Sequence, residues 1–241
     1  MTDVKTQINA SLNSLMNEFS SITHNLANVS TVGYKRQFSA FSKELAALQD
    51  AGDNQESFDI STAFDFSQGS ITETGRKLDV ALYGEGFFKI ETPDGALYTR
   101  NGMFHVNQNG QVVDSEGRMV AGDRGAIVIP SSVSLSQVNV SSDGTISAGA
   151  TAIDKFKIVD FEDNKGSLVP AGMNCYESKS EIDPKDAENA VVKQGYLESS
   201  NVKVVDELVN MIQVSRMYQA NMKFLNKQGE NGKSIMNVAM G

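Results

Sequence analysis

Several absences narrow the classes of protein that this sequence can encode. The chain has 241 residues, a single cysteine (Cys175) and no tryptophan. One cysteine excludes an internal disulfide and any metal site built from several cysteines. Aromatic residues make up 7%, which argues against a large aromatic platform for a ligand. The net charge is −9 and no basic cluster is larger than Lys35-Arg36, so we expect no nucleic-acid partner.

The sequence also lacks the segments that direct a chain into or across a membrane. No apolar run is long enough for a transmembrane helix, so we expect no membrane insertion. Residues 1–26 have no basic region followed by an apolar block, which is the pattern of a cleaved signal peptide. If the chain leaves the cytoplasm, we expect another export route.

No constellation for catalysis or metal binding is present. His24 and His105 have no cysteine or regularly spaced acidic partner. Gly84-Glu85-Gly86 lacks the third glycine and the following helix of a phosphate loop, which favours a strand kink. We therefore predict a protein that is not an enzyme, with no catalytic residue, no metal and no cofactor.

The N-terminal segment carries a narrow apolar stripe. Its apolar residues follow steps of three and four: Val4, Ile8, Leu12, Leu15, Phe19, Ile22, Leu26 and Val29. This spacing predicts a helix over residues 3–28 whose stripe faces another helix. The polar face is rich in Asn, Ser and Thr and poor in charge, which favours burial between protein neighbours over exposure to water. Gly33 suits a helix C-terminus, and Lys35 and Arg36 suit the negative end of the helix dipole.

The middle of the chain changes to a β pattern. Residues 34–63 form a connector that could be extended or helical, with a polar loop at 51–60. From residue 64 to 198, short apolar runs alternate with turns such as Pro93-Asp94-Gly95, Asn101-Gly102 and Asn109-Gly110. Turn signals every eight to twelve residues predict an antiparallel β domain.

The helical period returns after Gly195. Val205, Leu208, Ile212, Ser215, Met222 and Leu225 again step by three, four or seven. Ser199, Ser200 or Asn201 can cap this helix, and the tail after Leu225 looks less helical because of Gly229 and Gly232. Residues 1–33 and 199–241 are therefore predicted as helical ends that bracket the β domain. The predicted fold class is α+β, with the two end helices pairing as a coiled coil.

Three blocks of residues resemble one known family. They are Asn25-Leu26-Ala27-Asn28-Val29 through Gly33-Tyr34-Lys35-Arg36, then residues 78–88 with Tyr98-Thr99-Arg100-Asn101-Gly102, and finally residues 195–202 with 207–212 and Arg216-Met217-Tyr218. In this order they resemble the bacterial flagellar axial proteins of the rod and hook class. The short middle region favours a rod subunit. The third block resembles the distal rod protein. The compact length of the chain and residues 122–130 are more similar to the proximal rod protein, which we therefore favour.

The resemblance implies a structural subunit of the flagellar rod in the basal body. Such a subunit is exported through the flagellar type III apparatus and polymerises into a hollow helical tube with itself and with other rod and hook axial proteins. Its end helices are expected to be largely disordered in the monomer and to fold as coiled coils against neighbouring subunits. The expected family-motif residues are Asn25, Leu26, Ala27, Asn28, Gly33, Tyr34 and Lys35. The expected assembly interface comprises Ile8, Leu12, Leu15, Phe19, Ile22, Leu26, Val205, Leu208, Ile212, Met222 and Leu225.

A second hypothesis comes from another class of protein. A β domain with helical ends also suits a carbohydrate-binding or enzymatic module on an oligomerisation stalk. Such a module should gather ionisable residues at loop ends, whereas here they are scattered along the chain.

Overall fold

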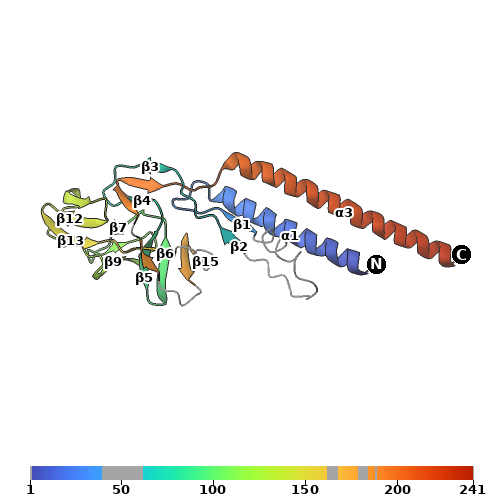
Figure 1. Cartoon of the computed structure of the whole chain (residues 1–241), viewed down its shortest axis with the longest axis horizontal. Coiled ribbons are helices and arrows are strands. Elements are labelled where there is room, and N and C mark those ends of the chain that lie inside the picture. Colours follow the sequence, from blue (N-terminus) through green and yellow to red (C-terminus); the bar gives the residue numbers. More distant parts are fainter. Residues whose placement is uncertain (1, 40–61, 162–167, 179–183, 188, 241) are drawn as a thin grey trace. The chain divides into compact units, whose positions relative to one another are not determined.

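The protein comprises two compact units. A computed structural model describes residues 2–39, 62–161, 168–178, 184–187 and 189–240, with side chains from residue 6 to residue 227. The helical unit contains Met1–Ala27, Gln37–Asp65 and Lys203–Gly241, and the β unit contains Asn28–Arg36 and Phe66–Val202. Figure 1 shows the two helices formed by the chain ends. The polar loop predicted at residues 51–60 lies outside the described residues.

The helical unit is built on α1 (Thr2–Ala27) and α3 (Val204–Met240). Both helices were predicted, and they bracket the β strands in sequence as expected. Two short strands, β1 (Gln37–Ser39) and β2 (Thr62–Phe64), pair antiparallel in the same unit. None of the described helices is both long enough and apolar enough to span a bilayer.

The bounds of α3 differ from the predicted ones at both ends. The helix begins at Val204, so Ser199, Ser200 and Asn201 do not cap it. These three residues precede the helix because hydrogen bonds hold them in the β unit. The Ser199 N–H donates to the Ser70 carbonyl at 2.8 Å, and the Asn201 side-chain oxygen accepts from the Arg36 N–H at 2.7 Å. The helix also continues to Met240 through Gly229 and Gly232. Asp206 and Glu207 occupy its first turn, where negative charge interacts favourably with the positive end of the helix dipole.

The β unit is built from short antiparallel strands. They are β3 (Ile71–Glu73), β4 (Val80–Tyr83), β5 (Phe87–Thr92), β6 (Gly95–Thr99), β7 (His105–Val106), β8 (Val112–Val113), β9 (Met119–Gly122), β10 (Gly125–Ala126), β11 (Val138–Val140), β12 (Thr145–Ala148), β13 (Thr151–Lys155), β14 (Ile158–Asp160), β15 (Leu168–Gly172), β16 (Cys175–Ser178), β17 (Lys185–Asp186), β18 (Val191–Gln194) and β19 (Tyr196–Glu198), with a 3-10 turn at Leu135–Gln137.

The largest sheet has the strand order β15-β16-β6-β5-β9-β8-β7, with β10 and β14 pairing beside it. Three smaller sheets are β11-β12-β13, β18-β4 and β19-β3. Phe88, Phe104 and Phe156 are fully or almost fully buried at the centre of the core, where Phe88 packs edge to face with each of the other two rings. Phe88 lies in β5, whereas Phe104 directly precedes β7 and Phe156 directly follows β13.

The predicted turns are confirmed except for one. The Pro93-Asp94-Gly95 turn connects β5 to β6, and the Asn109-Gly110 turn connects β7 to β8. Asn101-Gly102, predicted as a hairpin turn, does not join paired strands, because β6 and β7 lie apart in the sheet. Gly102 instead lies directly against the backbone of Val80, whose N–H donates to the Gly102 carbonyl at 3.0 Å. A side chain at Gly102 would collide with the Val80 oxygen, so the glycine permits a close approach of two backbones.

Candidate functional site

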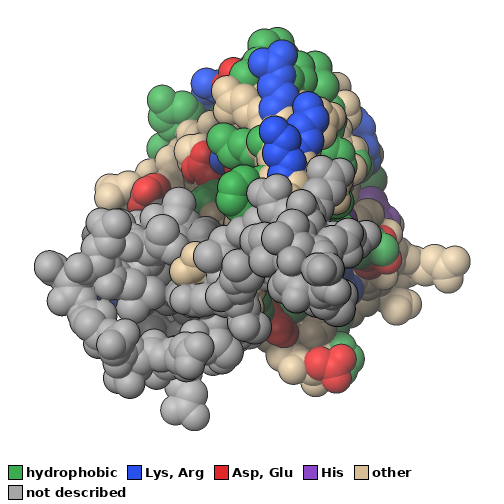
Figure 2. Space-filling model, turned by 90° about the vertical axis from the view of Figure 1, so that its right-hand side faces the viewer, with side chains coloured by type: hydrophobic (Ala, Val, Ile, Leu, Met, Phe, Trp, Pro, Cys, Tyr) green, Lys and Arg blue, Asp and Glu red, His purple; other side chains and the backbone are tan. Residues whose placement is uncertain are grey.

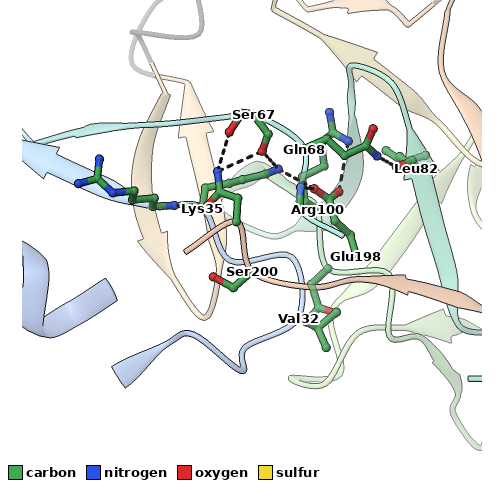
Figure 3. A network of polar contacts seen from close by, with 12 residues as sticks. Val32, Lys35, Ser67, Gln68, Leu82, Arg100, Glu198 and Ser200 are labelled. Atoms are coloured by element: carbon green, nitrogen blue, oxygen red, sulfur yellow. Dashed lines mark hydrogen bonds and ion pairs between the residues drawn. The ribbon is translucent and has the colours of Figure 1, made fainter. Parts of the chain in front are cut away.

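The β unit contains a buried ion cluster formed by Lys35, Arg100 and Glu198. Lys35 Nζ lies 2.7 Å from Glu198 Oε1, and these two side chains are 1% and 0% exposed. Arg100 Nη1 lies 3.4 Å from Glu198 Oε2. Figure 3 shows the three side chains converging on one point, although they come from segments far apart in the sequence.

Backbone groups complete the surroundings of these charges. Lys35 Nζ donates to the Ser67 carbonyl at 2.7 Å, and the Gly69 N–H donates to Glu198 Oε1 at 2.9 Å. Arg100 donates from Nη2 to the Gly84 carbonyl at 2.8 Å, and its guanidinium lies 5.4 Å from the centre of the Phe87 ring. Burial lowers the pKa of Arg100 from its ordinary value, and the charge of Glu198 opposes that effect.

The segment Asn28–Arg36 enters the β unit through Gly33. Gly33 has a φ of 66°, and its N–H donates to the Glu198 carbonyl at 2.7 Å. A Cβ at Gly33 would lie 2.5 Å from the Arg100 carbonyl carbon and 2.5 Å from the Asn101 nitrogen. The positive φ expected for Gly33 is confirmed, but its predicted place at the end of the helix is wrong, since α1 ends at Ala27.

The predicted role of Lys35 is likewise corrected. Lys35 does not lie at the helix C-terminus, where it would interact with the dipole, because it is buried against Glu198. Two asparagines fix the neighbouring backbone. In the helical unit, Asn25 pairs with both backbone groups of Gln37, donating to its carbonyl at 2.8 Å and accepting from its N–H at 2.9 Å. Asn28 accepts hydrogen bonds from Thr31 in the turn after the helix.

The Asn25 contact leads to a testable expectation. Asn25→Ala should lower the free energy of unfolding of the helical unit by about 1–3 kcal/mol, because a fully buried residue loses two hydrogen bonds. Asn17→Ala removes the same side chain from an exposed position of α1 and controls for helix propensity. Urea unfolding of both variants, followed at a helix band by circular dichroism, measures the difference. Equal midpoints for the two variants would contradict the role given to Asn25.

The helical unit contains an apolar contact between α1 and α3. Leu15 and Ile22 of α1 pack with Val214 of α3, and Leu26, Met211 and Tyr218 pack around them. Beside this contact lies an open groove of about 230 Å³, lined by Leu15, Met16, Phe19, Val214, Ser215 and Tyr218. Figure 1 shows α1 and α3 side by side over this length.

The predicted interface residues fall on two different surfaces. In α1, Leu12, Leu15 and Ile22 are buried, Ile8 and Leu26 are half-buried, and Phe19 is exposed in the groove. In α3, Val205, Leu208, Ile212 and Met222 are exposed, and Leu225 is half-buried. The face of α3 that meets α1 consists of Met211, Val214 and Tyr218, so the predicted stripe of α3 is mainly a second face that points away from α1. We call Val205, Leu208, Val209 and Ile212 the apolar outer face.

The cysteine thiol and the possible metal ligands do not form a reactive site in the described residues. Cys175 is buried in β16, and burial raises the pKa of its thiol even though Arg118 donates to its sulfur at 3.1 Å. Within the residues that the structure describes, no three His, Cys, Asp or Glu side chains are grouped in a way that could hold a metal ion.

Comparison with known proteins places this geometry in a family. One family model, described as the flagellar hook protein FlgE/F/G D1 domain, matches residues 81–148, and another, described as the flagellar basal body rod FlgEFG protein C-terminal, matches residues 193–238. A flagellar basal-body rod protein FlgG of Buchnera aphidicola is 36% identical over 85% of this chain and 87% of the relative. The chain belongs to the flagellar basal-body rod proteins. A FlgF of Caulobacter vibrioides is 31% identical over 92% of this chain and 91% of the relative, and a FlgG of Bacillus subtilis is 31% identical over 90% and 91%.

The buried ion cluster joins the two matched regions of this rod protein to its N-terminal motif. Arg100 lies in the first matched region and Glu198 in the second, and Lys35 belongs to the motif that begins at Asn25. Sequence reasoning included Arg100 and Glu198 in the family blocks but did not identify them as partners of Lys35. A charged residue at the end of a mainly apolar strand was the available signal, since Arg100 directly follows β6 and Glu198 is the last residue of β19.

Proposed function

We propose that this chain is a structural subunit of the bacterial flagellar rod and has no enzymatic activity. It polymerises through its terminal helices into a hollow helical tube, with itself and with other rod and hook axial proteins. The observation that carries the proposal is the apolar outer face of α3. Val205 is 72% exposed and Ile212 is 54% exposed, although both are large apolar residues. A contiguous apolar surface of this kind marks a protein interface.

The surfaces of α1 support the same proposal. Its exposed positions are largely Asn, Ser and Thr, including Asn13, Asn17 and Ser20, which lose less on burial than charged side chains do. The groove beside α1 offers Met16 and Phe19 to a partner. We propose that helices of neighbouring subunits pack on these surfaces in the manner of a coiled coil. Heterologous contacts that do not close into a ring generate a helical filament.

The domain roles follow from this arrangement. We propose that α1 and α3, which lie within the predicted ranges 1–33 and 199–241, are the assembly helices, that residues 34–63 include the connector, and that residues 64–198 form the β-rich domain. The family membership favours this axial role over the carbohydrate-binding or enzymatic module considered above. We further propose export through the flagellar type III apparatus without a cleaved signal, a location in the basal body, and no insertion into the membrane. The proximal position in the rod stays a prediction from the chain's length and residues 122–130.

A substitution on the outer face tests the proposal. Ile212→Asp should abolish rod assembly and leave the monomer folded, because it places an unpaired charge in the subunit contact at a side chain that is 54% exposed in the monomer. The measurement is the yield of basal bodies with complete rods, seen by electron microscopy, when the variant replaces the normal chain in its own bacterium. Circular dichroism of the purified variant checks the fold.

Two further variants complete that experiment. Ile212→Val keeps an apolar side chain and should assemble normally. Ile22→Asp should also prevent assembly but through a different cause, because Ile22 is 3% exposed and packs on α3 within the same chain. Normal rods from Ile212→Asp would refute the assignment of the outer face as an interface.

A further inference from the structure

The exposed face of α3 changes from apolar to basic along the helix. Val205, Val209 and Ile212 lie at helical spacing with Arg216, Lys223 and Lys227, and all six side chains are exposed. The steps of four, three, four, seven and four residues keep them on one side of the helix. We call Arg216, Lys223 and Lys227 the basic stripe. Figure 2 shows a column of Lys and Arg side chains over α3, next to hydrophobic ones.

The ion pairs of the described residues leave the basic stripe without a counter-charge. Among the described residues, no ion pair includes Arg216, Lys223 or Lys227. No acidic residue occurs between Glu207 and Glu230. Lys223 and Lys227 are four residues apart, where like charges on a helix repel one another. The helix therefore carries an unfavourable arrangement that an acidic partner would relieve.

The rest of the chain has the opposite charge. Residues 28–203 contain 25 Asp and Glu against 16 Lys and Arg. Exposed acidic side chains of the β unit include Glu73, Asp94, Glu116 and Asp123. A copy of this chain thus offers exposed carboxylates, which we call its acidic surface, to the basic stripe.

We infer that the basic stripe of α3 docks on the acidic surface of a second copy of this chain. The inference rests on the proposed assembly function and assigns different kinds of contact to different turns of one helix face. The first turns of α3 supply apolar contact, and the later turns supply charge complementarity, which sets the register between copies and makes association sensitive to salt.

A different partner for a basic, partly apolar helix face is an anionic membrane surface. The charge of the whole chain favours the second copy, because a protein with a net charge of −9 is repelled by an anionic bilayer and carries its own acidic partner surface. The membrane is accordingly tested as a competing outcome.

The test compares two double variants of the full-length chain. Lys223→Glu with Lys227→Glu reverses two charges of the basic stripe, and Lys77→Glu with Arg124→Glu makes the same change in net charge at exposed positions of the β unit. Sedimentation measures self-association between about 0.02 and 0.5 M salt. We expect association of the unmodified chain and of the β-unit variant to weaken at least about tenfold over this range, whereas the stripe variant associates weakly throughout and shows little salt dependence.

The outcomes separate this inference from the proposed function. If the stripe variant associates like the unmodified chain and keeps its salt dependence, or if the unmodified chain shows no salt-sensitive association, the inference is overturned. It is also overturned if the unmodified chain floats with phosphatidylserine-containing vesicles through these lysines and the stripe variant self-associates normally. In each case Ile212→Asp still reports on the apolar outer face, so rods lost in that variant leave the proposed function standing. A carbodiimide cross-link from Lys223 or Lys227 to a carboxylate of another copy, identified by mass spectrometry, would support the inference directly.

Discussion

Glu198→Gln should lower the free energy of unfolding of the β unit by about 3–5 kcal/mol. The substitution leaves Lys35 and Arg100 buried beside each other without the carboxylate that both contact. Removing one member of a buried ion pair is costly because the remaining charge keeps its desolvation cost and loses its counter-charge. Urea unfolding of the full-length chain, followed by circular dichroism of the strands, measures the loss.

The other members of the buried ion cluster should respond less strongly. Lys35→Met leaves Glu198 paired with Arg100 and should cost less than Glu198→Gln. The Lys35→Met, Glu198→Gln double variant should be more stable than the sum of the two single effects predicts, because the two residues interact directly. Glu73→Gln alters an exposed glutamate on the strand that pairs with β19 and should change stability by no more than about 0.5 kcal/mol. Additive effects of Lys35→Met and Glu198→Gln would show that the cluster is not an energetic unit.

Gly33→Ala should destabilise the β unit by about 3 kcal/mol or more, because two separate costs add at this position. The positive φ of 66° is unfavourable for a residue with a side chain. The added methyl group would also lie 2.5 Å from the backbone at Arg100 and Asn101, which cannot move aside as a side chain can. The expected result is partial release of the segment Asn28–Arg36 from the β unit, measured as faster amide hydrogen exchange at Gly33 and Lys35.

Two other glycines separate the cost of a positive φ from the steric cost of the added methyl group. Gly75 has a similar φ of 73°, but an added methyl carbon there would have no neighbouring atom within 4 Å, so Gly75→Ala should show the backbone cost alone, about 1–2 kcal/mol. Gly102 has a close approach to the Val80 oxygen without a positive φ, so Gly102→Ala should show the steric cost alone. Equal stability of Gly33→Ala and Gly75→Ala would rule out the close approach at Gly33 as a cause.

Local features of the sequence predicted much of the fold. The three- and four-residue steps from Val4 to Val29 were sufficient for α1, since apolar periodicity reports directly on a helix face. Turns such as Pro93-Asp94-Gly95 were also predictable, because the backbone preferences of proline and glycine act over a few residues. The order of the three motif blocks identified the family, which the comparisons then confirmed.

Other features could not be predicted from local patterns. The tail after Leu225 is helical to Met240 although its glycines argued for a looser end, since helix propensity is a weak preference that the rest of a helix can override. Asn101-Gly102 has the composition of a hairpin turn, yet it serves a close backbone contact because its flanking strands pair with other partners.

The sequence by itself determined the helical ends, the antiparallel β middle and the membership in the rod family. The tertiary structure decided which face of α3 meets α1 and which face remains exposed, because apolar residues occupy both faces and periodicity cannot assign a partner to either. It also decided that Lys35, Arg100 and Glu198 form one buried cluster. These residues are separated by 65 and 98 positions, and a charge pair over that distance leaves no periodic trace, since only the folded chain brings its members together.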